Sequence, residues 1–186
     1  PAVKVNELTP EGFEGILTAC SAVLHDGVTE RTVSECAVLV RTVEQPSTWI
    51  IPVIIISSGS DDVMSHLSPE LRDAFFAFVL DPKTGAQFGG IPLAQRLLMF
   101  SSERLPQPFL RRAASILQTL TAHIPEEHRA PFLALLAWVW WMSGLMSPAL
   151  AHLEQAGHLA PDHTIVETVT SMLSQGPALW VYGAEE

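Results

Sequence analysis

The chain has 186 residues, of which 48% are hydrophobic and 16% are charged, and its formal net charge at pH 7 is −10. Enough apolar side chains are present to form a core, which excludes an intrinsically disordered chain. The acidic balance argues against a nucleic-acid-binding protein, because such a protein needs a basic patch. The first residues show no signal-peptide pattern. They also lack an initial Met, so we expect a processed chain or a piece of a longer one.

The first 44 residues predict a helical hairpin. Thr9 has the N-cap position, Pro10 follows at the first helical position, and apolar residues then recur on one helical face as far as Leu24. Gly27 predicts the end of this helix, and Thr29 predicts the start of a second helix that runs to residue 44. We therefore expect two packed helices over residues 9–44.

Both cysteines of the chain fall within this predicted hairpin. Cys20 and Cys36 lie on apolar helix faces, and their spacing matches neither a zinc site nor a disulfide framework. We interpret them as small core residues. The alternatives are a disulfide between them and a reactive thiol. Two reduced cysteines fit a cytoplasmic location.

The segment STWIIPVIIISS at residues 47–58 has an ambiguous pattern. Its β-branched residues favour a strand. However, Pro52 cannot donate to a central ladder, and no second convincing strand is present to pair with. We favour a helix kinked near Pro52 and keep the strand as the alternative.

The rest of the chain predicts more helices and one long loop. Ser68 and Pro69 predict the start of a helix that ends near residue 80, and residues 81–92 are expected to form a loop. Further helices are expected near residues 93–104, 109–123, 126–142, 147–159 and 163–174. The predicted fold is all-α, with helical hairpins in a tetratricopeptide-like or irregular bundle arrangement. Residues 1–80 and 93–186 would form its two helical parts within one compact domain.

No charged side chain occurs between Ala130 and Ala151, which raises the possibility of a membrane span. A helix that crosses a bilayer needs roughly 20 consecutive apolar residues. Pro131, the Ser143–Gly144 pair and the Ser147–Pro148 pair divide this stretch into shorter pieces. We therefore predict a buried hairpin rather than a membrane anchor.

The spacing of small and large residues in this hairpin, residues 126–161, resembles one tetratricopeptide repeat, a helix-turn-helix unit of about 34 residues. Small residues let two antiparallel helices approach, and large ones fill the space between them. The residues on the pattern are Leu136, Ala137, Trp140, Gly144, Ala149, Leu153, Ala156 and Pro161. The second-helix spacing occurs again upstream, at Ala113, Leu117, Leu120 and Pro125.

Three residues of the first hairpin helix, Trp138, Trp141 and Met142, lie off its predicted inner face. Aromatic residues and methionine are enriched among the anchors of binding surfaces. We predict that these three side chains bind a protein partner, with Trp180 or Tyr182 as a secondary patch. The alternative is that this face packs on neighbouring helices.

We find no sequence pattern for catalysis, a metal or a cofactor. Neither a HExxH nor a CxxC motif is present, and Lys83–Thr84 precede the glycines of their loop, opposite to a phosphate-binding loop. Glu126 and Glu127 fall in the first turn of a predicted helix, where the macrodipole favours acidic side chains without any catalytic role. We therefore predict no catalytic residue, no metal ligand and no cofactor.

The closing segment APFLALLAWVWWMSGLMSPALAHLEQAGHLAPDHTIVETVTSMLSQG resembles the end of the actinobacterial family of domain of unknown function 4192, and LTPEGFEGILTACSAVLHDGVTERTVSECAVLVRTV does so more loosely. The residues that carry the resemblance are Trp138, Gly144, Ala149, Ala156, Pro161 and His163. The family has an acidic position after its glycine, whereas this chain has Leu145 and Met146 there. The resemblance implies a mostly helical cytoplasmic protein from an actinobacterium and implies no activity.

The function we expect is a cytoplasmic interaction module that binds a protein or peptide, or a second copy of itself, and neither a membrane nor a nucleic acid. The net charge favours a basic or neutral peptide. Two alternatives remain: part of an enzyme whose catalytic residues lie in a missing N-terminal segment, and a structural homodimer subunit.

Overall fold

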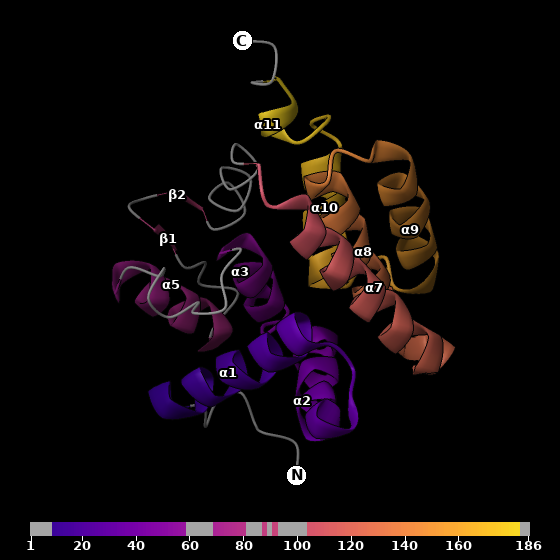
Figure 1. Cartoon of the computed structure of the whole chain (residues 1–186). Helices are drawn as coiled ribbons and strands as arrows, with labels where there is room; N and C mark the ends of the chain where they lie inside the picture. The colour runs from indigo at the N-terminus through magenta and orange to yellow at the C-terminus, as the bar shows by residue number, and fades with distance from the viewer. Residues whose placement is uncertain (1–8, 59–68, 81–86, 89–90, 93–103, 183–186) are drawn as a thin grey trace. The chain divides into compact units, whose positions relative to one another are not determined.

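A computed structural model describes residues 9–58, 69–80, 87–88, 91–92 and 104–182 (Figure 1). Helices dominate these residues. The β structure found among them is one antiparallel pair, β1 (Gln87–Phe88) and β2 (Ile91–Pro92). The predicted all-α fold is confirmed. The contacts divide the chain into two units, residues 1–96 and 97–186, and each is described by itself.

The N-terminal unit begins with the predicted hairpin. Helix α1 (Pro10–Asp26) starts where the Thr9 hydroxyl accepts a hydrogen bond from the backbone N–H of Gly12, at 3.1 Å. It ends at Gly27, whose φ of 86° suits a residue without a side chain. A short 3-10 turn, η2 (Glu30–Thr32), leads into α2 (Val33–Glu44), which packs against α1.

The ambiguous segment forms helix α3 (Ile50–Ser58), which confirms the helix and excludes the strand. Pro52 is its third residue, where the missing N–H removes no helical hydrogen bond and requires no kink. All residues from Ile50 to Ile56 are buried, and α3 packs on α1 and α2. Burial therefore overrides the weak helix propensity of the β-branched residues.

Helix α5 (Pro69–Leu80) adds to the same unit. The Phe76 ring lies against the ring of Phe13 in α1, with the ring centroids 5.6 Å apart. The helix predicted over residues 93–104 falls almost entirely outside the described residues, and so does most of the loop predicted over residues 81–92.

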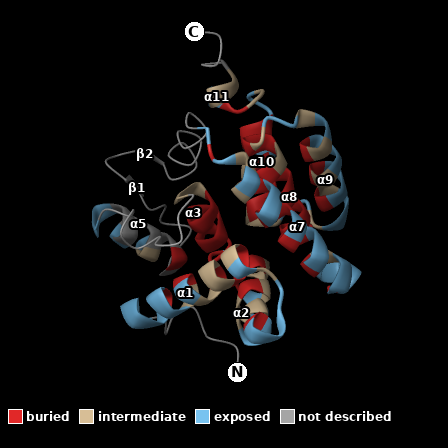
Figure 2. Cartoon of the chain, in the orientation of Figure 1, coloured by how far each residue is buried: buried red, intermediate tan, exposed pale blue. Residues whose placement is uncertain are grey.

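Helix α8 (Ala130–Met142) is the central helix of the C-terminal unit. It packs against α7 (Gln107–His123), α9 (Met146–Leu159) and α10 (Thr164–Leu173). Twelve of its thirteen residues are buried, as Figure 2 shows by its red colour. Thirteen residues measure about 20 Å along a helix, which is short of the ~30 Å of a bilayer core. None of the described helices has the length and apolarity that a membrane span requires.

The single helix predicted over residues 126–142 is wrong, because the structure has two elements there. A 3-10 turn, η3 (Glu126–His128), precedes α8. Pro131 lacks the N–H that an uninterrupted helix would donate to the carbonyl of Glu127, so it starts a new helix instead. Glu126 and Glu127 therefore lie in the first turn of η3 and not in the first turn of a long helix.

Candidate functional site

The structure buries the three residues predicted to bind a partner. Trp138 is 2% exposed, Trp141 is 1% exposed and Met142 is fully buried. This matches the alternative that their face packs within the protein. A partner could reach these side chains only if the packing around α8 opened. Their binding role stays a prediction, and the structure directs attention to other surfaces.

Two tryptophans connect α8 with the segment that follows α10. The indole N–H of Trp141 donates to the carbonyl of Gly176 at 2.8 Å, and that of Trp180 donates to the carbonyl of Met142 at 2.9 Å. By contrast, the buried indole N–H groups of Trp138 and Trp140 have no hydrogen-bond partner among the residues that the structure describes. The tryptophans of α8 therefore differ in their hydrogen bonding although they are neighbours in sequence.

Trp180, predicted as part of a secondary binding patch, is half-buried in α11 (Leu179–Tyr182) and packs on the turn between α8 and α9. A Cβ atom placed on Gly144 would lie only 3.0 Å from the Trp180 ring. The Arg104 guanidinium lies 5.2 Å from the centroid of the Trp180 ring, within cation–π distance. These contacts account for Trp180 as an intramolecular anchor. The side chain of Tyr182 lies outside the described part of the chain.

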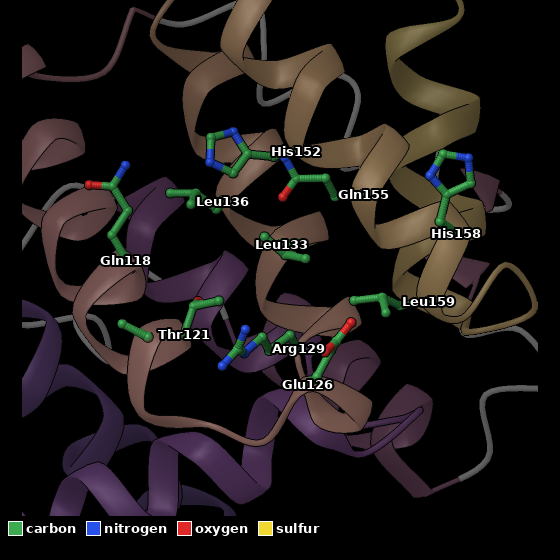
Figure 3. Close-up of a pocket in the computed structure, with 11 residues that line it drawn as sticks. Gln118, Thr121, Glu126, Arg129, Leu133, Leu136, His152, Gln155, His158 and Leu159 are labelled. Carbon is green, nitrogen blue, oxygen red and sulfur yellow. The ribbon is translucent and has the colours of Figure 1, made fainter.

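The C-terminal unit has an open groove of about 560 Å³ across α7, α8 and α9 (Figure 3). Leu133 and Leu136 of α8 lie between residues of α7 and residues of α9. The groove, which we call the α7–α9 groove, is lined by Gln118, Thr121, Ala122, Glu126, Arg129, Leu133, Leu136, His152, Gln155, His158 and Leu159. None of these residues was predicted from the sequence as a binding residue.

Four polar side chains of the α7–α9 groove have no hydrogen bond or ion pair within the described part of the protein. They are Gln118, Glu126, Gln155 and His158. All four are exposed. Each can therefore bond a ligand without first breaking an intramolecular contact, so the groove can offer both donors and acceptors.

Three other polar side chains of the groove form hydrogen bonds with backbone carbonyls four or five residues earlier in the chain. The Nε–H of Arg129 donates to the carbonyl of Ile124 at 2.8 Å, and the Thr121 hydroxyl donates to a carbonyl one turn earlier at 2.6 Å. The Nδ1 of His152 lies 2.7 Å from the carbonyl of Pro148, and because a carbonyl only accepts, Nδ1 donates this hydrogen bond. These bonds restrict the side chains before any ligand arrives, which lowers the entropy cost of binding.

The two cysteines have different environments. Cys20 is buried, and its Sγ lies 3.8 Å from the Thr42 hydroxyl. Burial raises the pKa of the Cys20 thiol to about 12, which makes it a poor nucleophile near neutral pH. Cys36 is half-buried, and both cysteines are free, so the alternative of a disulfide between them is not realised. Among the described residues, no group of three or more His, Cys, Asp or Glu side chains is placed to hold a metal ion.

Fold and groove together define the class of the protein: an all-α helical protein with a solvent-open groove in its C-terminal unit. The family model of domain of unknown function 4192 matches residues 67–178, more than half of the chain, and the chain belongs to this family. This confirms the family resemblance. The N-terminal segment with the looser resemblance lies outside the match. No curated protein and no solved structure matches the chain.

The matched region contains every residue of the α7–α9 groove. A sequence signal for the groove does exist. His152, Gln155 and Leu159 recur at intervals of three and four residues along one face of α9, and Gln118 with Thr121 does so on α7. What the sequence does not show is that these two mostly polar faces border the same part of α8.

Proposed function

We propose that the chain is a cytoplasmic protein-interaction module whose α7–α9 groove binds an extended segment of a partner protein. The observation that carries this proposal is the set of unbonded side chains along an open groove with leucines between its walls. The leucines provide apolar contacts, and the exposed amides provide hydrogen bonds that can orient a bound ligand. Ligand sites commonly combine these two features.

The size of the groove suits a short extended segment. From His152 to Leu159, α9 borders it over eight residues, and the seven rises between them measure about 10 Å at ~1.5 Å each. An extended chain rises about 3.3 Å per residue, so roughly three residues of a partner would span this length. Their side chains could alternate between the leucine floor and solvent.

The chemistry of the walls suits a peptide backbone. Gln118 on α7 and Gln155 on α9 each carry one amide, which has donors and an acceptor. A peptide group likewise offers one N–H and one C=O, and an extended segment has no internal hydrogen bonds to satisfy them. Two amides on opposite walls could therefore fix the backbone of a segment that lies between them.

A pair of matched variants tests this function. Ala122→Trp would place an indole in the groove from its α7 side. Ala151→Trp changes an exposed alanine of α9 that does not line the groove. The full chain would be panned against a displayed library of linear peptides, and enriched peptides would be measured by fluorescence anisotropy. We expect Ala122→Trp to weaken binding at least tenfold and Ala151→Trp to leave it unchanged.

The proposal fails if no enriched peptide is sensitive to Ala122→Trp, or if both variants weaken binding equally. Circular dichroism would check that both variants keep their helicity. The tryptophans predicted from the sequence make a poor probe of binding, because replacing the buried Trp138 or Trp141 would also disturb the core.

A further inference from the structure

We infer that the segment bound in the α7–α9 groove carries an acidic residue whose side-chain carboxylate binds Arg129. This inference rests on the proposed function and names the chemistry of the partner. It starts from the one permanently charged cation among the residues that line the groove.

The guanidinium of Arg129 is held in place with its outer nitrogens unused. Arg129 is half-buried, and its Nε–H donates to the carbonyl of Ile124 at 2.8 Å. No other side-chain bond of Arg129 is found within the described part of the protein, and no carboxylate oxygen there lies within 4.0 Å of it. A guanidinium oriented through Nε presents its two outer nitrogens to a ligand.

The neighbouring acid does not neutralise this arginine. Glu126 lies three residues earlier and lines the same groove, yet the two side chains form no ion pair. In Figure 3 the guanidinium of Arg129 extends toward Thr121 of α7, whereas the carboxylate of Glu126 extends toward Leu159 of α9. The bond from Nε to Ile124 accounts for this separation, because it fixes the arginine away from the acid.

The net charge of −10 favours a basic or neutral peptide as a whole, but the side chain that meets Arg129 is selected by this one cation. A carboxylate is the anion that fits these surroundings. One guanidinium balances one monoanion through two parallel hydrogen bonds. A phosphate group would bring nearly two negative charges beside Glu126, in a chain of net charge −10. Because the groove is open, the partner chain can continue past the site, which favours an Asp or Glu side chain over a chain terminus.

The test uses the peptides that bind the full chain and that Ala122→Trp blocks. In each peptide, every Asp and Glu is replaced in turn by Asn or Gln, and each product is measured against the wild-type chain, Arg129→Gln and Arg129→Lys. The control is Arg111→Gln, which removes an exposed arginine of α7 outside the groove. A charge-assisted hydrogen-bonded pair contributes roughly ten- to a hundred-fold in affinity.

We expect one acidic position in the peptide to lose that affinity when neutralised, and Arg129→Gln to cause the same loss. Combining the two changes should cause little further loss, because both remove one interaction. Arg129→Lys should recover only part of the affinity, since an ammonium cannot reproduce the two parallel bonds. Arg111→Gln should have no effect, and added salt should weaken wild-type binding.

The inference is overturned if groove-bound peptides need no acidic residue, if they need a phosphorylated residue or a free C-terminus instead, or if Arg129→Gln binds as the wild type does. In each of these cases Ala122→Trp still blocks the peptides, so the proposed function stands. Were no peptide sensitive to Ala122→Trp, the proposed function itself would fail. Thermal unfolding of Arg129→Gln would show whether the variant keeps its fold.

Discussion

Among the described helices, α3 and α8 are the most apolar of their units, and their buried residues differ in chemistry. Seven of the nine residues of α3 are buried, and they are five isoleucines, one valine and one proline. Twelve of the thirteen residues of α8 are buried, and they are mostly alanine, leucine and tryptophan. Both helices have a proline in the first turn, where it removes no helical hydrogen bond.

The difference lies in polar atoms. The buried side chains of α3 are hydrocarbon, so that helix requires only close packing. The tryptophans of α8 bring N–H groups into the interior, and one of them, Trp141, donates to the segment after α10. The packing of a helix with only hydrocarbon side chains depends on their volumes. The packing of a tryptophan-rich helix depends also on the positions of the acceptors for its indole N–H groups. The variants below separate these two contributions.

Truncation of one central side chain in each helix should have the largest effect. Ile54→Ala in α3 and Leu135→Ala in α8 each remove methyl groups from residues that are at most 2% exposed. We expect each variant to lower the free energy of unfolding by about 2–5 kcal/mol, because the lost burial leaves a cavity. Urea unfolding followed by circular dichroism would measure the loss.

Exposed apolar residues provide the control for these truncations. Val33→Ala and Leu150→Ala change side chains that are 63% and 49% exposed. We expect each to cost under about 1 kcal/mol, because little apolar surface leaves water at these positions. If Ile54→Ala cost as little as Val33→Ala, α3 would not be a core helix.

A second variant changes the end of α8. Gly144→Ala places a methyl group on a residue with a φ of 78° and about 3.0 Å from the Trp180 ring. The left-handed backbone alone costs an alanine about 1–2 kcal/mol, and the close contact adds to it. We expect a total loss near 2–3 kcal/mol in urea unfolding.

The contact with Trp180 can be isolated from the backbone effect. In a Trp180→Ala background the ring is absent, so Gly144→Ala should cost only the backbone contribution. Equal losses in both backgrounds would mean that the ring does not restrict residue 144. That result would mean that the contact between the Trp180 ring and residue 144 does not help to anchor α11 to the turn.

Sequence patterns predicted most helices of the described fold, because apolar periodicity and capping residues act locally. Thr9 and Pro10 marked the start of α1, and the Ser143–Gly144 pair marked the end of α8. The break before Pro131 was missed, although a proline at that point is itself a local signal. The family was also identified from the residues of the closing segment.

The site was not predictable in the same way. Trp138 and Trp141 were chosen because they lie off one face of a hairpin, but a central helix has neighbours on every face, and only the packing of α7 and α10 reveals that. The groove depends on two faces that are far apart in the sequence. Local patterns cannot show which helices border a common surface.

The buried thiol of the N-terminal unit predicts a pH effect. The pKa of Cys20 is raised from 9.0 to about 12 by burial, so above pH 9 the unfolded chain loses this proton before the folded chain does. The contribution of Cys20 to the free energy of unfolding is therefore fully present below pH 9 and falls as the pH rises toward 12. Between pH 8 and pH 10 we expect a loss of about 1.4 kcal/mol. Urea unfolding at both pH values would measure it.

Cys20→Ala removes the titrating group and serves as the reference for this effect. The variant has its own packing cost, so the comparison is between slopes and not between absolute stabilities. A Cys20→Ala protein that loses as much stability between pH 8 and pH 10 as the wild type does would show that other groups cause the pH dependence.

The smallest expected effect compares two tryptophans of α8. Trp141→Phe and Trp138→Phe remove the same ring volume from sites that are 1% and 2% exposed, but only Trp141 donates a hydrogen bond, to the carbonyl of Gly176. The destabilisation caused by the smaller ring should be similar in the two variants. Trp141→Phe should then be less stable than Trp138→Phe by at least about 1 kcal/mol, because it loses one hydrogen bond whereas Trp138→Phe removes an unpaired buried donor. Paired urea titrations would measure the difference. If the two variants were equally stable, packing alone would specify α8, as it does α3, and the contrast between these helices would disappear.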